Sequence, residues 1–316
     1  MGRVARCLPL VAVTTFAVVV FGAPLASAKV PGSNGRIAFA REMRPEHLAT
    51  FTIDPDHTHA TRLLRGSEVP RWSPDGTEIA VLSCQNPPDC TTAMAIVDPD
   101  TGEVVRWFES PDPDLFIGCY AWAPDGARLA CGGFGDTDQT MTGLYSIDAT
   151  DGTDLIQITS NPGGEDSPGD YSPDGKRIVF LRTDPDRPEG RNQALFITHA
   201  DGWGRPHRIT PWGLSEETGS WSPDGNKILF AGAGILYTVS VGEGTIRRIR
   251  LGQPGGPAFD PVWSPNGKKI AFALFRHVTS QSDIWTATAD GRGMRRVTHT
   301  RHRWEHFPDW GSHPTM

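Results

Sequence analysis

A five-residue motif recurs along this chain and constrains its fold more than any other feature. The motif is an aromatic residue followed by Ser-Pro-Asp-Gly or a close variant. Its copies span residues 72–76, 122–126, 171–175, 221–225 and 263–267. Half copies stand near the two ends, as Asn34-Gly35 and as Pro308-Asp309-Trp310. From Gly35 to Gly267 the motif glycines are separated by 41, 50, 49, 50 and 42 residues. Such a period is typical of propeller blades or solenoid repeats.

The motif has the residues of a tight turn between two antiparallel strands. Proline presets the backbone angle φ of the first turn position, aspartate suits the second, and glycine adopts the left-handed conformation that closes the hairpin. A short apolar run follows each turn, at residues 37–39, 79–81, 129–131, 178–180, 228–230 and 270–272. Runs that are apolar at successive positions are typical of strands covered on both faces, as where one blade stacks on the next. The sequence therefore predicts an all-β fold, a six-bladed β-propeller of four-stranded antiparallel blades.

The order of strands within the repeat predicts how the ring closes. The motif aromatic ends the first, innermost strand of each repeat, but the first copy begins at its second strand and the last copy ends near Trp310. We therefore expect the C-terminal strand to complete the first blade. The expected blades are residues 36–65 with 306–311, 68–109, 118–160, 169–211, 218–251 and 260–299.

Residues 1–28 have the features of a secretory signal peptide. Two arginines precede a short apolar run, and Ala26-Ser27-Ala28 provides a cleavage site. The run is too short for a membrane-spanning helix, and no later stretch is apolar enough to be one. The sequence predicts cleavage near Ala28. The mature protein, residues 29–316, should be a single propeller domain that is secreted or periplasmic.

Net charge limits the class of partner. The chain carries a formal charge of −7, and the predicted signal holds two arginines and no acids, which gives the mature protein −9. This charge argues against nucleic acid or anionic lipid as a partner and favours cations or basic proteins. We expect a monomer.

Four cysteines remain after removal of the signal, an even number suited to an oxidising compartment. Cys84 and Cys90 bracket a short loop, and Cys119 and Cys131 lie on the two strands beside one motif turn. We expect the local pairs 84–90 and 119–131, with the other two connectivities open. A zinc site is the alternative, although the spacing of these cysteines is unlike that of zinc ligands.

The repeat W-SPDG-x-x-IAF…DG…R-[IV]-T resembles that of the TolB-like six-bladed propellers, which are related to WD-repeat-like modules. The resemblance covers nearly all of residues 32–314. TolB, of the Tol–Pal envelope system, carries an α/β domain before its propeller, and we expect none here because the repeats begin directly after the predicted signal. The same repeat occurs beside peptidase domains and in some polysaccharide lyases, so the family leaves the function open.

No catalytic motif stands out in the sequence: there is no G-x-S-x-G elbow, no H-E-x-x-H and no phosphate loop. We therefore expect a non-enzymatic binding or scaffold protein. Its protein or peptide partner should contact the propeller face whose loops are unequal in length. The alternative is a metal-dependent enzyme of the lyase or lactonase type, with its site at the mouth of the central channel.

The densest polar group lies at the C-terminal end and comprises His299, His302, Glu305, His306 and His313. We interpret it as a solvated connection. Metal binding is the alternative, although the spacing fits no standard site.

Acidic residues precede the motif aromatic in most repeats and are the candidate site. These are Glu68, Asp166, Glu217, Asp260 and Glu305. Because the innermost strands line the channel, we expect these side chains to gather at one mouth. A ring of like charge raises the pKa of its members or recruits a cation. We predict that the ring binds a divalent cation, or a lysine or arginine side chain of a partner, and expect no other cofactor. The alternative is five acids that point separately into water.

Overall fold

The computed structural model describes residues 33–44, 47–54, 58, 60–84, 92–135, 137–215, 217–253, 255–275, 281–300 and 303–312. The predicted signal peptide, Cys90, His302 and His313 lie outside these ranges.

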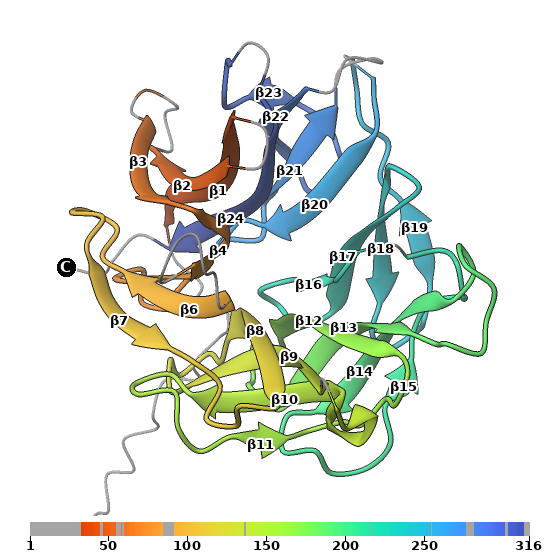
Figure 1. Ribbon diagram of the computed structural model, residues 1–316. Coiled ribbons are helices and arrows are strands. Elements are labelled where there is room, and N and C mark those ends of the chain that lie inside the picture. The colour runs from red at the N-terminus through yellow and green to blue at the C-terminus, as the bar shows by residue number, and fades with distance from the viewer. Residues whose placement is uncertain are drawn as a thin grey trace, which may run out of the picture.

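The described chain forms six four-stranded sheets around a common centre (Figure 1). From the inner to the outer strand, blade 1 contains β24 (Glu305–Ser312), β1 (Asn34–Arg44), β2 (His47–Ile53) and β3 (Ala60–Arg65), and blade 2 contains β4 (Ser67–Trp72), β5 (Ile79–Cys84), β6 (Thr92–Val97) and β7 (Val104–Phe108). Blade 3 contains β8 (Leu115–Trp122), β9 (Arg128–Gly135), β10 (Gly143–Asp148) and β11 (Ile156–Gln157), and blade 4 contains β12 (Glu165–Tyr171), β13 (Arg177–Thr183), β14 (Gln193–His199) and β15 (His207–Arg208). Blade 5 contains β16 (Ser220–Trp221), β17 (Lys227–Gly232), β18 (Ile235–Ser240) and β19 (Ile246–Arg248), and blade 6 contains β20 (Ala258–Trp263), β21 (Lys269–Phe275), β22 (Ser282–Thr288) and β23 (Arg295–Arg296).

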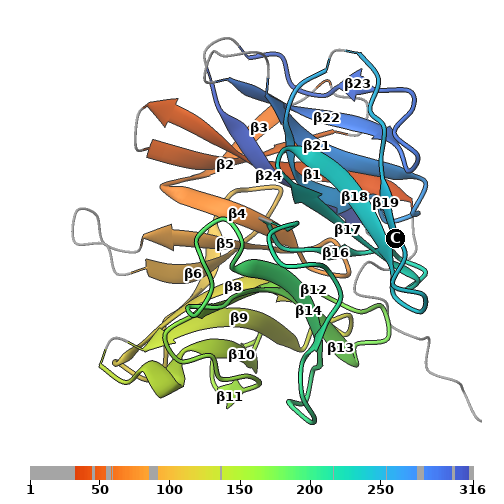
Figure 2. The ribbon, with the colours of Figure 1, turned by 90° about the vertical axis from the view of Figure 1, so that its right-hand side faces the viewer.

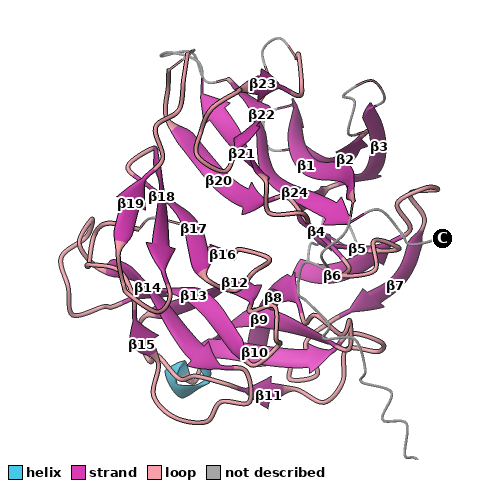
Figure 3. Ribbon diagram, turned by 180° about the vertical axis from the view of Figure 1, so that it is seen from behind, coloured by secondary structure: helices cyan, strands magenta, loops and turns pink. Residues whose placement is uncertain are grey.

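All strand pairs within these blades are antiparallel, so the predicted six-bladed propeller is confirmed. A short 3-10 helix, η1 (Gln139–Met141), lies between β9 and β10. The view in Figure 2 shows the blades stacked side by side, and Figure 3 shows the ring from behind.

Hydrogen bonds within the motif explain its composition. In blade 2 the Ser73 hydroxyl donates to Asp75 Oδ1 at 2.6 Å, and Ser73 Oγ accepts the backbone N–H of Glu78 at 2.9 Å. The same serine–aspartate bond recurs in the motifs of blades 4 and 5. Gly76 has a φ of 74°, and a Cβ on it would lie 2.5 Å from the carbonyl oxygen of Ser312. The motif therefore closes the hairpin and also leaves room for the end of β24.

The C-terminal strand completes blade 1 as predicted. Trp310 pairs with Ile37 in the β24–β1 register, its indole donates to Gly35 O at 3.0 Å, and only 4% of its surface is exposed. The core lies between neighbouring blades, where the apolar runs of the second strands are fully buried. For example, Phe39 of blade 1 belongs to one buried cluster with Ala273 and Ile284 of blade 6. The ring is thus closed by hydrogen bonds and by packing.

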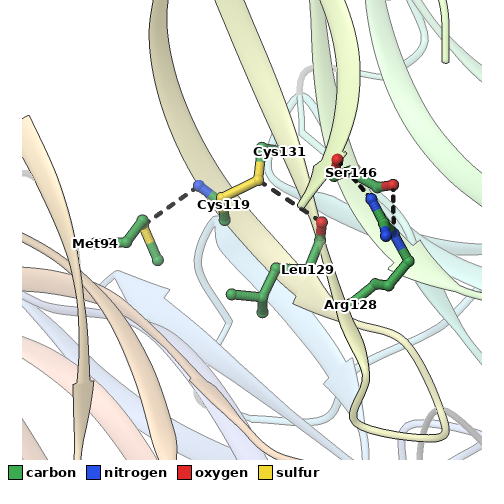
Figure 4. Close-up of a disulfide and its surroundings, with 6 residues drawn as sticks. All are labelled: Met94, Cys119, Arg128, Leu129, Cys131 and Ser146. Atoms are coloured by element: carbon green, nitrogen blue, oxygen red, sulfur yellow. Dashed lines mark hydrogen bonds between the residues drawn. A yellow bond between two sulfur atoms is a disulfide. The ribbon is translucent and has the colours of Figure 1, made fainter. Parts of the chain in front are cut away.

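The predicted disulfide between Cys119 and Cys131 is present (Figure 4). The two residues are direct partners in the β8–β9 ladder, and both are buried. The backbone N–H of Cys119 donates to Met94 Sδ of blade 2 at 3.3 Å. Cys90 lies outside the described residues, so the pair 84–90 stays a prediction. Non-reducing peptide mapping that links Cys84 to Cys119 or Cys131 would contradict it.

Replacement of Cys119 and Cys131 by alanine should weaken the protein without abolishing its fold. The bond closes a loop across 12 residues, and a loop near this length stabilises a protein by about 3 kcal/mol. We expect the unfolding free energy in denaturant to fall by up to about that amount. A double variant that unfolds at the same denaturant concentration as the wild type would contradict this account.

Candidate functional site: the central channel

A cavity of about 400 Å³ lies at the centre of the ring, bounded by residues of all six blades. Its described charged side chains are Glu68, Arg71, Asp170, Glu217, Asp260 and Asp309. Five carboxylates therefore face one guanidinium. Aromatic rings, including those of Tyr120 and Phe307, and several prolines form much of the remaining wall.

Three of the five acids predicted from the sequence line this cavity. They are Glu68, Glu217 and Asp260. Asp166 and Glu305 do not line it, and both are almost fully buried, with 1% and 0% of their surface exposed. The expected gathering of all five acids at one mouth is therefore corrected to three. Whether the acids bind a cation stays a prediction.

Asp166 and Glu305 instead form equivalent ion pairs within their own blades, each with the arginine opposite it on the second strand. Arg182 donates to both carboxylate oxygens of Asp166, at 2.7 and 2.6 Å, and Arg41 donates to Glu305 Oε1 at 2.6 Å. A threonine at the end of the preceding blade also donates to each acid, Thr159 to Asp166 and Thr298 to Glu305. The threonine contacts join one blade to the next.

Three charged residues of the channel were missed by the sequence reasoning. Arg71, Asp170 and Asp309 each stand directly before the motif aromatic. The recurrence of a charged residue at this position of the repeat could have identified them. Asp309 Oδ2 accepts the backbone N–H of Trp72 at 2.8 Å, and Asp170 Oδ2 accepts that of Trp221 at 3.0 Å. Each aspartate therefore holds the inner strand of the following blade.

Glu217 and Asp260 continue this pattern around the ring. Glu217 Oε2 accepts the backbone N–H of Asp260 at 2.6 Å, and Asp260 Oδ2 accepts that of Phe307 at 3.0 Å. The carboxylates of blades 1, 4, 5 and 6 thus each contact the backbone of the next blade. This arrangement fixes the acids around the channel.

Strained backbone lies beside the acids. Val69, Asp260 and Phe307 have φ values of 51°, 51° and 52°. Each stands three residues before its motif tryptophan and is followed directly by a proline. Such values are rare for residues other than glycine, above all for valine. The ladder register shifts at these points, as expected for β-bulges. Bulges re-aim side chains, and strained backbone is often found at functional sites.

Burial changes the pKa values of groups along the channel. It raises the pKa of the Asp260 carboxyl, against the opposing effects of the Phe307 N–H and the Arg71 guanidinium. Burial also raises the pKa of Glu68. Burial and the nearby Glu68 charge raise the pKa of Tyr120. The channel is therefore a crowded, poorly hydrated acidic environment, in which the added positive charge of a ligand would be stabilised.

The described part of the histidine-rich group does not form a metal site. Glu305 is paired with Arg41, His299 is exposed, and the His306 ring lies 4.4 Å from that of Phe307. Across the described residues, no three His, Cys, Asp or Glu side chains come close enough to hold a metal ion.

His306 should make stability depend on pH. Burial lowers its pKa to about 4 from the usual 6.5, so the unfolded chain takes up the proton first as the pH falls. The stability contributed by the neutral ring is full above pH 6.5, and about 3 kcal/mol is lost between pH 6.5 and 4. We expect His306→Gln to lack this loss, as measured by unfolding both proteins at pH 7 and pH 4. The account is wrong if the difference between the two proteins is the same at both pH values.

The ring of four-stranded blades and its central channel define a β-propeller protein. The family model described as TolB beta propeller domain matches residues 33–241, more than half of the chain. The chain belongs to this TolB beta-propeller family.

Two curated relatives show the extent of the likeness. An uncharacterized protein of Agrobacterium fabrum is 28% identical over 208 residues, which cover 64% of this chain and 63% of that protein. The Tol-Pal system protein TolB of Francisella tularensis subsp. mediasiatica is 29% identical over 113 residues, which cover 34% of this chain and 26% of that protein. The chain thus spans less than two thirds of the length of either relative.

Solved structures share the fold. The crystal structure of TolB from Acinetobacter baumannii matches with a TM-score of 0.66 and 21% identity, over 88% of this chain and 67% of that chain. Oligogalacturonate lyase in complex with manganese matches with a TM-score of 0.51 and 16% identity, over 79% of this chain and 70% of that chain. At these identities the likeness concerns the fold alone.

Proposed function

We propose that this protein is an exported, non-enzymatic binding propeller that holds a protein or peptide partner at its acidic channel. The observation that carries the proposal is the excess of carboxylates over cations among the described lining residues, five against one. Low-dielectric walls focus such a field and attract positive charge. A relative that is by its name a Tol-Pal system protein supports a role in binding.

A lysine or arginine side chain of the partner fits the channel better than a metal ion. Among the described residues, no three His, Cys, Asp or Glu side chains come close enough to hold a metal ion. Four of the channel carboxylates instead each accept a backbone N–H of a different blade; these are Glu217, Asp260, Asp309 and Asp170. Arg71 already lines the same cavity, and its charge opposes the rise that burial causes in the pKa of Asp260. A single cationic side chain can share separated carboxylates in this way, whereas calcium needs six to eight oxygen ligands around one point.

Export rests on the predicted signal at residues 1–28, which lies outside the described residues. Within the described ranges, no helix has the length and apolar character that crossing a membrane requires. The net negative charge of the chain suits a basic partner rather than an anionic lipid surface.

The metal-dependent enzyme is the second candidate. Its support is the fold shared with the manganese complex of oligogalacturonate lyase. A shared fold alone does not show that two proteins share an activity.

Titration calorimetry with an acetylated, amidated hexalysine peptide tests the proposal. We expect the wild-type mature protein to bind the peptide and the double variant Glu217→Gln/Asp260→Asn to lose that binding. The matched control is Glu103→Gln/Glu243→Gln, which removes the same charge from exposed positions. These two residues lie in the turns between the third and fourth strands of blades 2 and 5 and do not line the cavity. It should bind like the wild type.

Equal loss of binding in the control variant would show that only overall charge matters, and the channel would not be the site. Calcium and manganese are titrated in parallel. Tight binding of either ion that depends on Glu217 and Asp260 would favour the cation over the basic side chain and would reopen the enzyme alternative.

A further inference from the structure

Two exposed phenylalanines stand at the open end of the β8–β9 hairpin of blade 3, far from its turn. Phe116 is the second residue of β8, Phe134 is the last but one of β9, and the two are direct partners across the strands. They are 53% and 52% exposed. The Cβ atoms of such a pair lie about 5 Å apart, so the rings form one apolar surface, here called the aromatic shelf. Contiguous exposed apolar surface marks an interaction site.

The aromatic shelf lies on the side of β8 that leads into the channel. Side chains alternate along a strand, so Phe116 shares its side with Gly118. A Cβ on Gly118 would lie 2.7 Å from the hydroxyl of Tyr120, which lines the cavity. Residues on the other side, such as Ile117 and Cys119, are buried in the core that joins blades 2 and 3. Four residues of extended strand separate the shelf from Tyr120, a distance of about 13 Å.

The two phenylalanines stay exposed although the next blade packs against the same hairpin. Blade 4 packs against Gly132, where an added Cβ would lie 3.0 Å from Asp166 O, but it leaves Phe116 and Phe134 uncovered. Phe116 stands six residues before its motif tryptophan, whereas Glu68 and Glu217 stand four before theirs. Because the inner strands of all blades run in the same direction, the shelf lies about 7 Å further out than these acids.

We infer that the partner is an extended peptide segment that carries an aromatic or large aliphatic side chain two to four residues from a lysine or arginine. The basic side chain enters the channel, where charge complementarity holds it, and the apolar side chain covers the aromatic shelf. An extended chain spans about 3.3 Å per residue, so two to four residues cover the roughly 7 to 13 Å that separate the shelf, along the strand direction, from the level of the acids and from Tyr120. The inference rests on the proposed function and specifies its ligand.

Selection from a displayed library of random heptapeptides on immobilised mature protein tests the inference. We expect the wild type to enrich peptides with a basic residue and an apolar residue two to four positions apart. Phe116→Ser/Phe134→Ser should bind the best of these peptides about tenfold more weakly, as for loss of an aromatic anchor. Trp203→Ser is the control, because Trp203 is 76% exposed and lies between β14 and β15, away from the shelf and the cavity lining. It should bind like the wild type.

The outcomes separate this inference from the proposed function. The inference is wrong if the enriched peptides share a basic residue but no apolar residue at a fixed spacing from it. It is also wrong if the phenylalanine variant binds with unchanged affinity. Either result leaves the acidic channel as the site. Absence of any enrichment for basic residues overturns both.

Discussion

Deletion of residues 305–316 should abolish the cooperative fold. The deletion removes β24, the inner strand of blade 1, and leaves β1 paired on one side only, with β2. It also removes Trp310, which is 4% exposed, and the buried ion pair of Glu305 with Arg41. Loss of one large buried aromatic costs about 3 to 5 kcal/mol, against a total stability of about 5 to 15 kcal/mol for a typical domain. Thermal unfolding followed by circular dichroism should show no native transition.

The control is a deletion of residues 313–316, which keeps β24 whole and should melt like the full-length protein. A chain that ends at residue 304 and melts with the full-length protein would refute the ring closed through blade 1.

Asp166→Ala and Glu305→Ala should each lower the unfolding free energy by about 3 to 5 kcal/mol, because each leaves a largely buried arginine without its carboxylate. The arginine is Arg182 for Asp166 and Arg41 for Glu305. Denaturant unfolding measures the loss. The double variant Asp166→Leu/Arg182→Met removes both charges and should recover much of it.

The same variants separate a structural from a ligand-binding role. We expect Asp166→Ala to bind the hexalysine peptide as the wild type does at temperatures where it is folded. An Asp166→Ala protein that keeps its stability and loses the peptide would return this acid to the binding site.

The fold could be predicted because its signals are local and repeated. The Ser73–Asp75 bond recurs in blades 4 and 5, and the glycine has a positive φ in all five full copies of the motif. Both depend only on residues a few positions apart. The closure through Trp310 followed from strand order alone. The pairing of Cys119 with Cys131 was predicted from their places on the two strands beside one motif turn, and the two are direct partners in the ladder.

The candidate site could be predicted only in part because β-bulges change which way a side chain faces. Without a bulge, residues four and one before the motif aromatic would lie on opposite sides of the strand. The bulge at Val69 adds one residue, so Glu68 and Arg71 both face the channel. Asp166, one position further from its aromatic than Glu68, faces the neighbouring blade instead. A φ of 51° at a valine has no reliable sequence signal.

Cross-linking of the bound hexalysine peptide with a water-soluble carbodiimide, followed by peptide mapping, tests the central claim most directly. The reagent joins lysine amines to the carboxylates that they contact. We predict cross-links to Glu68, Glu217 or Asp260, which line the channel from three different blades. Cross-links confined to acids on the outer surface, such as Glu103 and Glu243, would contradict the assignment of the channel as the binding site.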